Sequence, residues 1–151
     1  MRDLRPKAFA ATELFLDLVH IVRSHTDLDL DSLVIMFSIN EATMRPLMLN
    51  PHTPKDARLA PAPPEEYRGS ISMLAVAERV GLPRETVRRK TKALVEAGLV
   101  IEDSRGRYRA KAALMEERTQ QVVREAHAAV KRYDKRLRQL GRPGIGGPSE
   151  G

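Results

Sequence analysis

The chain has 151 residues, of which 42% are hydrophobic and 4% aromatic, and it contains no cysteine. This length fits one domain with appendages or two small domains with mostly aliphatic cores, and the composition excludes disulfides and thiolate chemistry. The formal net charge of +6 favours an acidic partner. No apolar run approaches the roughly 20 residues that span a bilayer, and acidic residues interrupt any signal-peptide core, so we expect a cytoplasmic protein with no membrane partner.

Residues 1–49 are predicted to form an N-terminal helical segment. Apolar residues recur at helical spacing over residues 8–24. A second helix is expected after Asp27 or Asp29, either of which would cap its first turn. A strand over LVIMFSI, residues 33–39, is the alternative. Pro46 is expected to kink or end this second helix, because proline has no N–H to donate.

Residues 50–66 contain five prolines and little apolar periodicity. This composition predicts a Pro-rich linker or an extended surface crossing. The linker divides the chain by charge. Residues 1–66 carry seven Lys and Arg against ten Asp and Glu, a net −3; residues 67–110 carry ten against five, a net +5; residues 111–151 carry nine against five, a net +4.

Residues 67–110 carry the most specific pattern in the chain. Ser72 is placed to cap a helix that ends at about Val80, and Gly81 supplies the left-handed conformation that ends such a helix. Pro83 fits only the first turn of a new helix. That next helix is predicted over about 84–97, with an inward stripe of Val87, Thr91, Leu94 and Val95.

A small hairpin is predicted to follow. Residues 99–101 (LVI) have the character of a strand, EDSRGR is typical of a turn around Gly106, and Tyr108 begins the return strand. Helix, tight turn, helix and hairpin is the order of a winged helix-turn-helix.

The segment LAVAERVGLPRETVRRKTKALVEAGLVIEDSRGRY, residues 74–108, resembles the DNA-binding domain of bacterial winged helix-turn-helix transcriptional regulators, such as the MarR and GntR families. Its most specific pieces are the AERVGL turn, the ETVRR helix start and EAGLV before the hairpin. Two positions depart from the family pattern: Pro83 stands where Ser or Thr usually caps the helix, and Thr91 where a larger aliphatic is common. The resemblance implies a mainly α fold with a small β-hairpin wing, here flanked by N-terminal helices and a long C-terminal helix, and it assigns no subfamily.

The helix over 84–97 carries five cationic side chains within nine residues. Like charges four residues apart repel one another, so this arrangement does not stabilise the free helix, whereas DNA phosphates would neutralise it. We therefore predict a recognition helix in the major groove and a wing, about 102–108, on the adjacent backbone or minor groove; a merely solvated charged face is the alternative. The predicted DNA-binding residues are Arg84, Glu85, Thr86, Arg88 and Arg89 at base edges, Lys90 and Lys92 at phosphates, and Arg105 and Arg107 in the wing.

Residues 111–140 contain no helix breaker, and their apolar residues alternate three and four apart, which indicates contact with another helix. The partner would be either the N-terminal helices of the same chain or a second copy. Regulators that it resembles usually dimerise through terminal helices, so we expect a homodimer on an inverted repeat in double-stranded DNA. Residues 141–151 are expected to form a disordered tail. The predicted interface consists of Met115, Val122, Ala126, Val130, Tyr133, Leu137 and Leu140.

No arrangement typical of nucleophilic catalysis or of a phosphate-binding loop is present, and the four histidines show no metal-ligand spacing with acids. We therefore expect no enzymatic activity, no metal and no cofactor, and place Glu125 on a solvated helix face. A winged helix used for protein contacts, or as a phage or replication accessory factor, is the alternative function. The operator, the direction of regulation and any small-molecule effector are not identified by the sequence.

Overall fold

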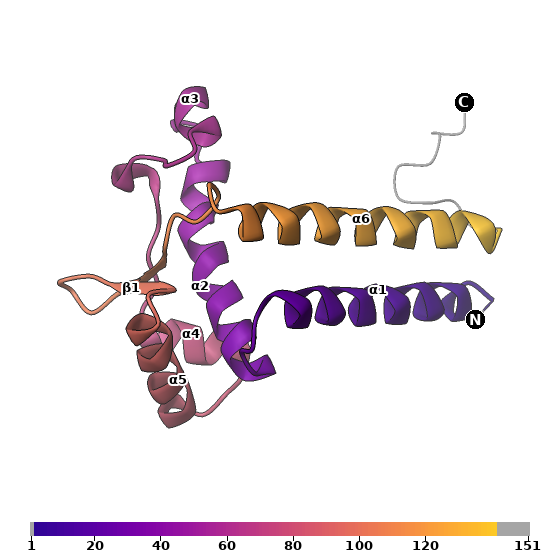
Figure 1. Ribbon diagram of the computed structural model, residues 1–151, viewed down its shortest axis with the longest axis horizontal. Helices are drawn as coiled ribbons and strands as arrows, with labels where there is room; N and C mark the ends of the chain where they lie inside the picture. Colours follow the sequence, from indigo (N-terminus) through magenta and orange to yellow (C-terminus); the bar gives the residue numbers. More distant parts are fainter. Residues whose placement is uncertain (1, 142–151) are drawn as a thin grey trace. The chain divides into compact units, whose positions relative to one another are not determined.

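The computed structural model describes residues 2–141. These residues form two compact units: one consists of residues 28–115, and the other of residues 2–27 together with residues 116–141. The structure is mostly helical with one small antiparallel hairpin, which confirms the predicted fold class (Figure 1). None of the helices within residues 2–141 is long and apolar enough to cross a membrane. The elements are α1 (Leu4–His25), α2 (Leu30–Leu49), α3 (Lys55–Leu59), the short 3-10 helix η1 (Glu65–Tyr67), α4 (Met73–Val80), α5 (Arg84–Glu96), β1 (Val100–Glu102), β2 (Tyr108–Ala110) and α6 (Glu117–Gln139).

The apolar run after Asp29 forms the helix α2, not a strand. The Asp29 carboxylate caps this helix by accepting a hydrogen bond from the N–H of Ser32 at 2.8 Å. Pro46 does not end α2, which continues to Leu49. A proline removes only one N–H donor, and the N–H of Asn50 closes the last turn by donating to the Pro46 carbonyl oxygen at 3.1 Å.

The helix α2 belongs to the same unit as the predicted winged domain. It contributes Ile35 and Ile39, both 0% exposed, to the hydrophobic core of residues 28–115. The predicted grouping of residues 1–49 as one N-terminal segment therefore differs from the structure. A domain of some 45 residues buries too little apolar surface by itself, and α2 enlarges its core. The buried core residues are Ile35, Ile39, Ile71, Val76, Ala77, Val87, Leu94, Val100 and Tyr108.

The Pro-rich connection over residues 50–66 is folded onto this unit and contains α3 and the start of η1. Thr53 and Ala57 are buried within it. Just after η1, the chain passes very close to α2 at Gly69. A Cβ atom on Gly69 would lie 2.3 Å from the Ala42 carbonyl oxygen and 2.9 Å from Pro46 Cγ, so no larger residue fits there. The predicted linker is thus an ordered connection with close packing.

The hairpin of β1 and β2 is attached to α2 and to the segment before α4. Val100 pairs with Ala110 across the hairpin, and both are buried. Ile71 exchanges two backbone hydrogen bonds of 2.8 Å with Tyr108, which extends the pairing to a third segment. The Thr43 hydroxyl of α2 accepts a hydrogen bond from the N–H of Ala110 at 2.9 Å. These contacts fix the base of the wing.

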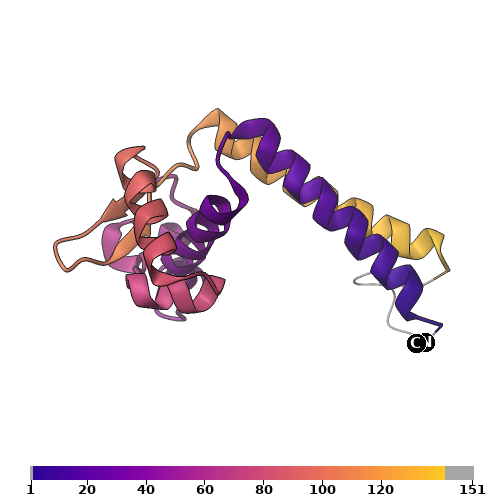
Figure 2. The ribbon, with the colours of Figure 1, turned by 90° about the horizontal axis from the view of Figure 1, so that it is seen from below.

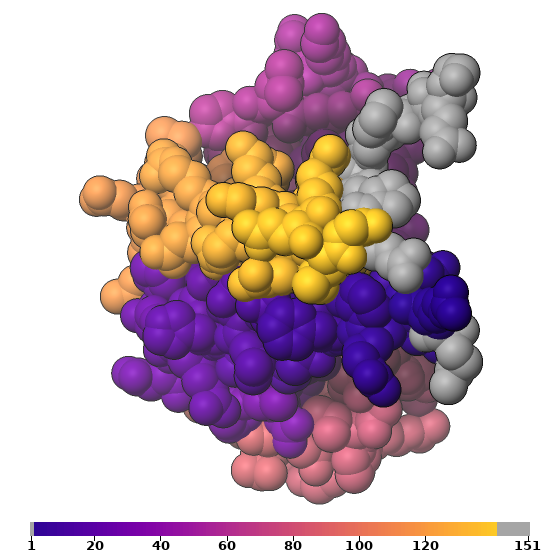
Figure 3. Space-filling view, turned by 90° about the vertical axis from the view of Figure 1, so that its right-hand side faces the viewer, coloured from indigo at the N-terminus to yellow at the C-terminus, as the bar shows by residue number. Residues whose placement is uncertain are grey.

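The helices α1 and α6 form the second unit and lie side by side (Figures 1 and 2). In the space-filling view, the atoms of α1 (indigo) and the last turns of α6 (yellow) are in direct contact (Figure 3). Three side-chain contacts show that the two helices are antiparallel, because residue numbers rise along α1 as they fall along α6. These contacts are the ion pairs Glu13–Arg136 at 2.7 Å and Asp17–Arg132 at 3.1 Å and the hydrogen bond between His25 and Glu125 at 2.8 Å.

Two expectations for the C-terminal region change with the structure, and a third concerns residues that the structure does not describe. Glu125 is not simply solvated, because its hydrogen bond with His25 holds the pKa of the Glu125 carboxyl below its usual range. Met115 lies before α6, in the other unit, and is 68% exposed, so it is not part of the predicted stripe on that helix. The disordered tail was predicted for 141–151, and residues 142–151 lie outside the described residues.

Candidate nucleic-acid interface

The turn between α4 and α5 has the predicted geometry. The Ser72 hydroxyl caps α4 by accepting a hydrogen bond from the N–H of Ala75 at 3.2 Å. Gly81 ends α4 with φ 69°, a left-handed conformation that favours glycine. Pro83 takes the N-cap position of α5 with φ −57°, and no side chain caps that helix. The short turn therefore sets two helices in the order expected for a helix-turn-helix.

The inner face of α5 is anchored in the core. Val87, Thr91 and Leu94 are 0%, 0% and 1% exposed, as predicted from their spacing. The buried Thr91 hydroxyl has no hydrogen-bond partner among the described residues. Because these three residues fix the rotation of α5, the opposite face of the helix must point away from the core.

The outer face of α5 carries the predicted charged residues. Arg84, Glu85, Arg88, Arg89 and Lys92 are all exposed. Arg88 donates two hydrogen bonds to the Glu85 carboxylate, from Nε at 2.9 Å and from Nη2 at 2.5 Å. This hydrogen bonding lowers the pKa of Glu85 and raises the pKa of Arg88. One of the cations is therefore partly neutralised within its own helix.

The other three cations of this face are available to an external anion. Arg84, Arg89 and Lys92 make no ion pair and no side-chain hydrogen bond with any residue in the described part of the chain. The charge of Arg89 contributes only a smaller, Coulombic part to the lowered pKa of Glu85. Thr86 lies half-buried at the start of the helix. The arrangement places uncompensated positive charge beside polar groups that are able to form directed hydrogen bonds.

Lys90 occupies a different position from the other cations of α5. Its side chain is only 17% exposed, and its Nζ lies 2.9 Å from the Asp29 carboxylate at the N-terminus of α2. Two hydrogen bonds, first that from the Ser32 N–H and then that from Lys90, lower the pKa of Asp29 from 3.8 to about 2. Lys90 thus joins α5 to the N-terminus of α2.

We expect Asp29→Ala to destabilise the fold by about 1 kcal/mol, because it removes both the cap and the ion pair. Asp29→Asn should cost less, since asparagine caps as well as aspartate and an ion pair whose carboxylate partner is 59% exposed contributes little. The folded-state pKa of Asp29 is depressed, so its stabilisation is present above pH 3.8 and is lost as the pH falls towards 2. Urea unfolding from pH 7 to pH 2 tests this: equal losses in the two variants would contradict the capping role.

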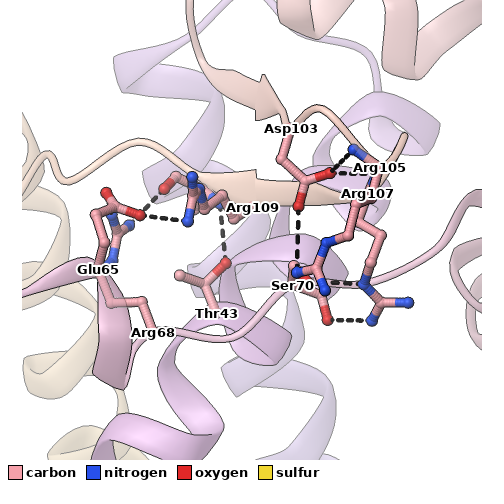
Figure 4. A network of polar contacts seen from close by, with 9 residues as sticks. Thr43, Glu65, Arg68, Ser70, Asp103, Arg105, Arg107 and Arg109 are labelled. Carbon is pink, nitrogen blue, oxygen red and sulfur yellow. Dashed lines mark hydrogen bonds and ion pairs between the residues drawn. The ribbon is translucent and has the colours of Figure 1, made fainter.

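The wing carries two arginines with different environments (Figure 4). Arg105 is at the tip and 76% exposed, with Nη2 3.9 Å from the Asp103 carboxylate. Arg107 is turned back onto the domain, where it donates hydrogen bonds to the Ser70 hydroxyl at 2.8 Å and to the Ser70 carbonyl oxygen at 2.9 Å. Of the two predicted wing residues, Arg105 alone projects outward.

Other cations near the hairpin are bound within the fold. Arg68 and Arg109 both form ion pairs with Glu65, and Arg68 also donates to the carbonyl oxygen of Ala110 (Figure 4). On α4, Arg79 pairs with a carboxylate of α2. The net charge of +5 over residues 67–110 therefore overstates the charge offered to a partner. What remains is concentrated on the outer face of α5 and at the wing tip.

Two residues that hold cationic side chains of this region were not predicted from the sequence to do so. Asp29 was expected only as a helix cap, yet it also binds Lys90. Ser70 was given no role, yet it holds Arg107. No local sequence signal marks either contact, because the partners are 61 and 37 residues apart in the chain.

The fold and this interface together define a winged helix-turn-helix DNA-binding domain. Comparison with protein families agrees: residues 67–101 match a family model described as winged helix-turn-helix DNA-binding. The match covers α4, the turn, α5 and the start of the wing. Comparisons with curated proteins and with solved structures gave no match.

Proposed function

We propose that the protein is a bacterial, cytoplasmic transcriptional regulator that binds a specific DNA site as a homodimer. The observation that carries this proposal is the outer face of α5, where Arg84, Arg89 and Lys92 have no ionic partner within the described chain. DNA phosphates neutralise such charges with release of counterions, and arginine forms bidentate bonds with guanine. The helix α5 would lie in the major groove and the wing on the adjacent backbone or minor groove.

The side chains divide into reading and positioning groups. Arg84, Glu85, Thr86, Arg88 and Arg89 stand in the first two turns of α5, the part that reaches base edges in such domains. Lys92, one turn further along the helix, is assigned to a phosphate contact. Arg105 is assigned to the wing's contact, either with a phosphate of the adjacent backbone or in the minor groove. Because Lys90 is held by Asp29, it is assigned to the support of α5.

The proposed dimer rests on two apolar stripes in the unit of α1 and α6. On each helix the residues lie alternately four and three apart, the spacing of a helix–helix contact. Several are well exposed, including Phe15 at 60%, Val123 at 52% and Val130 at 43%. The α1 stripe consists of Leu4, Ala8, Ala11, Phe15, Leu18 and Val22, and the α6 stripe consists of Val123, Ala126, Val130 and Tyr133. Leu137, which the sequence placed in this interface, is 5% exposed and is buried within the helix pair of one chain instead.

The two stripes lie on the same face of the helix pair. At 100° per residue, each stripe is turned by roughly 120–130° in the same sense from the mean direction of the side chains that bond across the helix pair. Because α1 and α6 are antiparallel, equal rotations bring both stripes to one side. The helix pair itself buries little: within the described unit, Ala10, Ile21, Ala129 and Leu137 are the buried apolar residues.

A second copy of the chain is the occupant that we propose for this face. Two helices alone bury too little apolar surface for independent stability, whereas two such pairs form a four-helix bundle with a closed core. This extends the interface predicted on 111–140 by adding α1 to it. A two-fold axis through the bundle would relate two recognition helices, so the operator would be an inverted repeat.

Selection of bound sequences from random double-stranded DNA tests this function. We expect enrichment of an inverted repeat with half-site centres about 10–10.5 bp, or a multiple of that spacing, apart. Recovery of a single unrepeated half-site would contradict the dimer. Absence of any enriched sequence, at a salt concentration where bulk DNA is bound, would contradict sequence-specific regulation.

A further inference from the structure

The wing loop between β1 and β2 is closed by hydrogen bonds within it. The Asp103 carboxylate accepts hydrogen bonds from the N–H groups of Arg105 at 2.8 Å and Arg107 at 3.0 Å. The Asp103 N–H donates to the Arg107 carbonyl oxygen at 2.8 Å, and the Gly106 N–H donates to the Asp103 carbonyl oxygen at 3.1 Å. Asp103 is only 14% exposed, and Gly106 has φ 71°, which favours glycine. The loop is a closed turn.

The Arg107 side chain ties this turn to the rest of the domain. Its Nε donates to the Ser70 hydroxyl at 2.8 Å and its Nη2 to the Ser70 carbonyl oxygen at 2.9 Å (Figure 4). Ser70 is followed by Ile71, which is paired with β2 through Tyr108. Two donors at a fixed separation are a property of guanidinium, and the single ammonium nitrogen of lysine does not reproduce them.

Arg105 has none of these restraints on its side chain. It lies two residues before Arg107 at the tip, is 76% exposed, and has only a long 3.9 Å contact with Asp103. Its backbone is nevertheless fixed, because its N–H is bound by the Asp103 carboxylate. A fixed backbone under a free cationic side chain offers the charge to an anion without a further cost for ordering the backbone.

We propose that Arg107 is a positioning residue: together with Ser70 and Asp103 it holds the wing so that Arg105 is the wing side chain that contacts DNA. This inference rests on the proposed function, and it reassigns Arg107 from a direct contact to a support. Without the Ser70 anchor, the turn at Ser104–Gly106 would have to be ordered when DNA binds. That ordering would reduce affinity even where the charge is retained.

The test uses Arg107→Lys and Arg107→Ala, with Arg105→Ala and Arg105→Lys as the matched pair at the tip. Affinity for the selected DNA site is measured by fluorescence anisotropy over a range of salt concentrations. Arg107→Lys should lose affinity about as far as Arg107→Ala, roughly tenfold, with a nearly unchanged salt dependence. Arg105→Ala should lower the slope of log K against log salt by about one, while Arg105→Lys keeps it.

Coupling between the two positions gives a second readout. If Arg107 acts through Arg105, the loss of affinity in the double variant Arg105→Ala/Arg107→Ala should be much smaller than the sum of the losses in the two single variants. Full additivity would overturn the proposal. So would an Arg107→Lys variant that binds like the unmodified protein, because that result indicates a direct phosphate contact made by charge alone.

Hydrogen exchange separates this proposal from the DNA-binding function. In the protein without DNA, Arg107→Lys should accelerate amide exchange at Arg105 and Gly106, since both N–H groups are bound within the turn. Unchanged exchange there would overturn the anchor even if DNA binding is confirmed. Failure of the unmodified protein to bind any DNA site would instead overturn the proposed function, whatever the exchange rates show.

Discussion

Replacing Arg89 with alanine is expected to weaken binding to the preferred DNA site by about 1–3 kcal/mol, or roughly 5- to 150-fold. Arg89 is exposed on the outer face of α5 and has no ion pair or side-chain hydrogen bond with a described residue. Its removal therefore deletes an interaction with DNA without exposing a buried partner. We expect a loss in the same range for Arg88→Ala, although this arginine must share or leave its bonds to Glu85.

Gel-shift titration of the preferred and of an unrelated sequence measures this effect. Arg45→Ala provides the charge-matched control, because it removes one exposed arginine of the same unit from α2, outside the proposed interface. Lys92→Ala should weaken both sequences about equally and reduce the salt dependence by about one unit. If Arg89→Ala binds the preferred site as tightly as the unmodified protein, with circular dichroism also unchanged, α5 does not read DNA.

Introducing glutamate at both Phe15 and Val130 is expected to convert the homodimer into a monomer. Both side chains are exposed within one chain, at 60% and 43%, so a charge there costs the isolated helix pair little. In the proposed bundle each glutamate would be buried without a partner, which costs several kcal/mol. Charges at Val122 and Tyr133 are less informative, because these residues are half-buried within one chain.

Sedimentation or light scattering should then report a monomer at micromolar concentration. Affinity for the inverted repeat should fall far more than affinity for unrelated DNA, since the two recognition helices would no longer bind together. Leu16→Glu is the matched control: Leu16 is also 60% exposed but lies about 100° around α1 from Phe15. A dimer that Leu16→Glu disrupts equally, or an unmodified protein that is already monomeric, would defeat the proposed interface.

The elements of the DNA-binding domain were predictable because their determinants are local. A serine cap at Ser72 and left-handed glycines at Gly81 and Gly106 act on the backbone within one turn of chain. The inward stripe of Val87, Thr91 and Leu94 follows from helical periodicity alone, and so does the basic face on the opposite side. The spacing of residues along one helix thus determined which side chains form the candidate interface.

Tertiary structure decided which cationic side chains of that interface are bound within the protein and which are not. Lys90 and Arg89 are neighbours in the sequence, yet Lys90 is bound to Asp29 while Arg89 has no ionic partner in the described chain. Arg107 and Arg105 differ in the same way, since Ser70 binds Arg107 alone. An ion pair or hydrogen bond between distant residues requires two elements to be placed within about 3 Å, and helical spacing carries no information about that placement.

The packing of α2 shows why apolar patterns left the domain boundary undetermined. The run after Asp29 correctly predicted a helix, but Val34 and Phe37 in that run are 40% and 45% exposed. It did not predict that Ile35 and Ile39 would complete the core of the DNA-binding unit. The stripes on α1 and α6 likewise mark faces that require a partner. Because the hydrophobic effect is non-directional and depends on the area removed from water, an apolar stripe determines which face of a helix is covered, whereas only the tertiary structure decides what covers it.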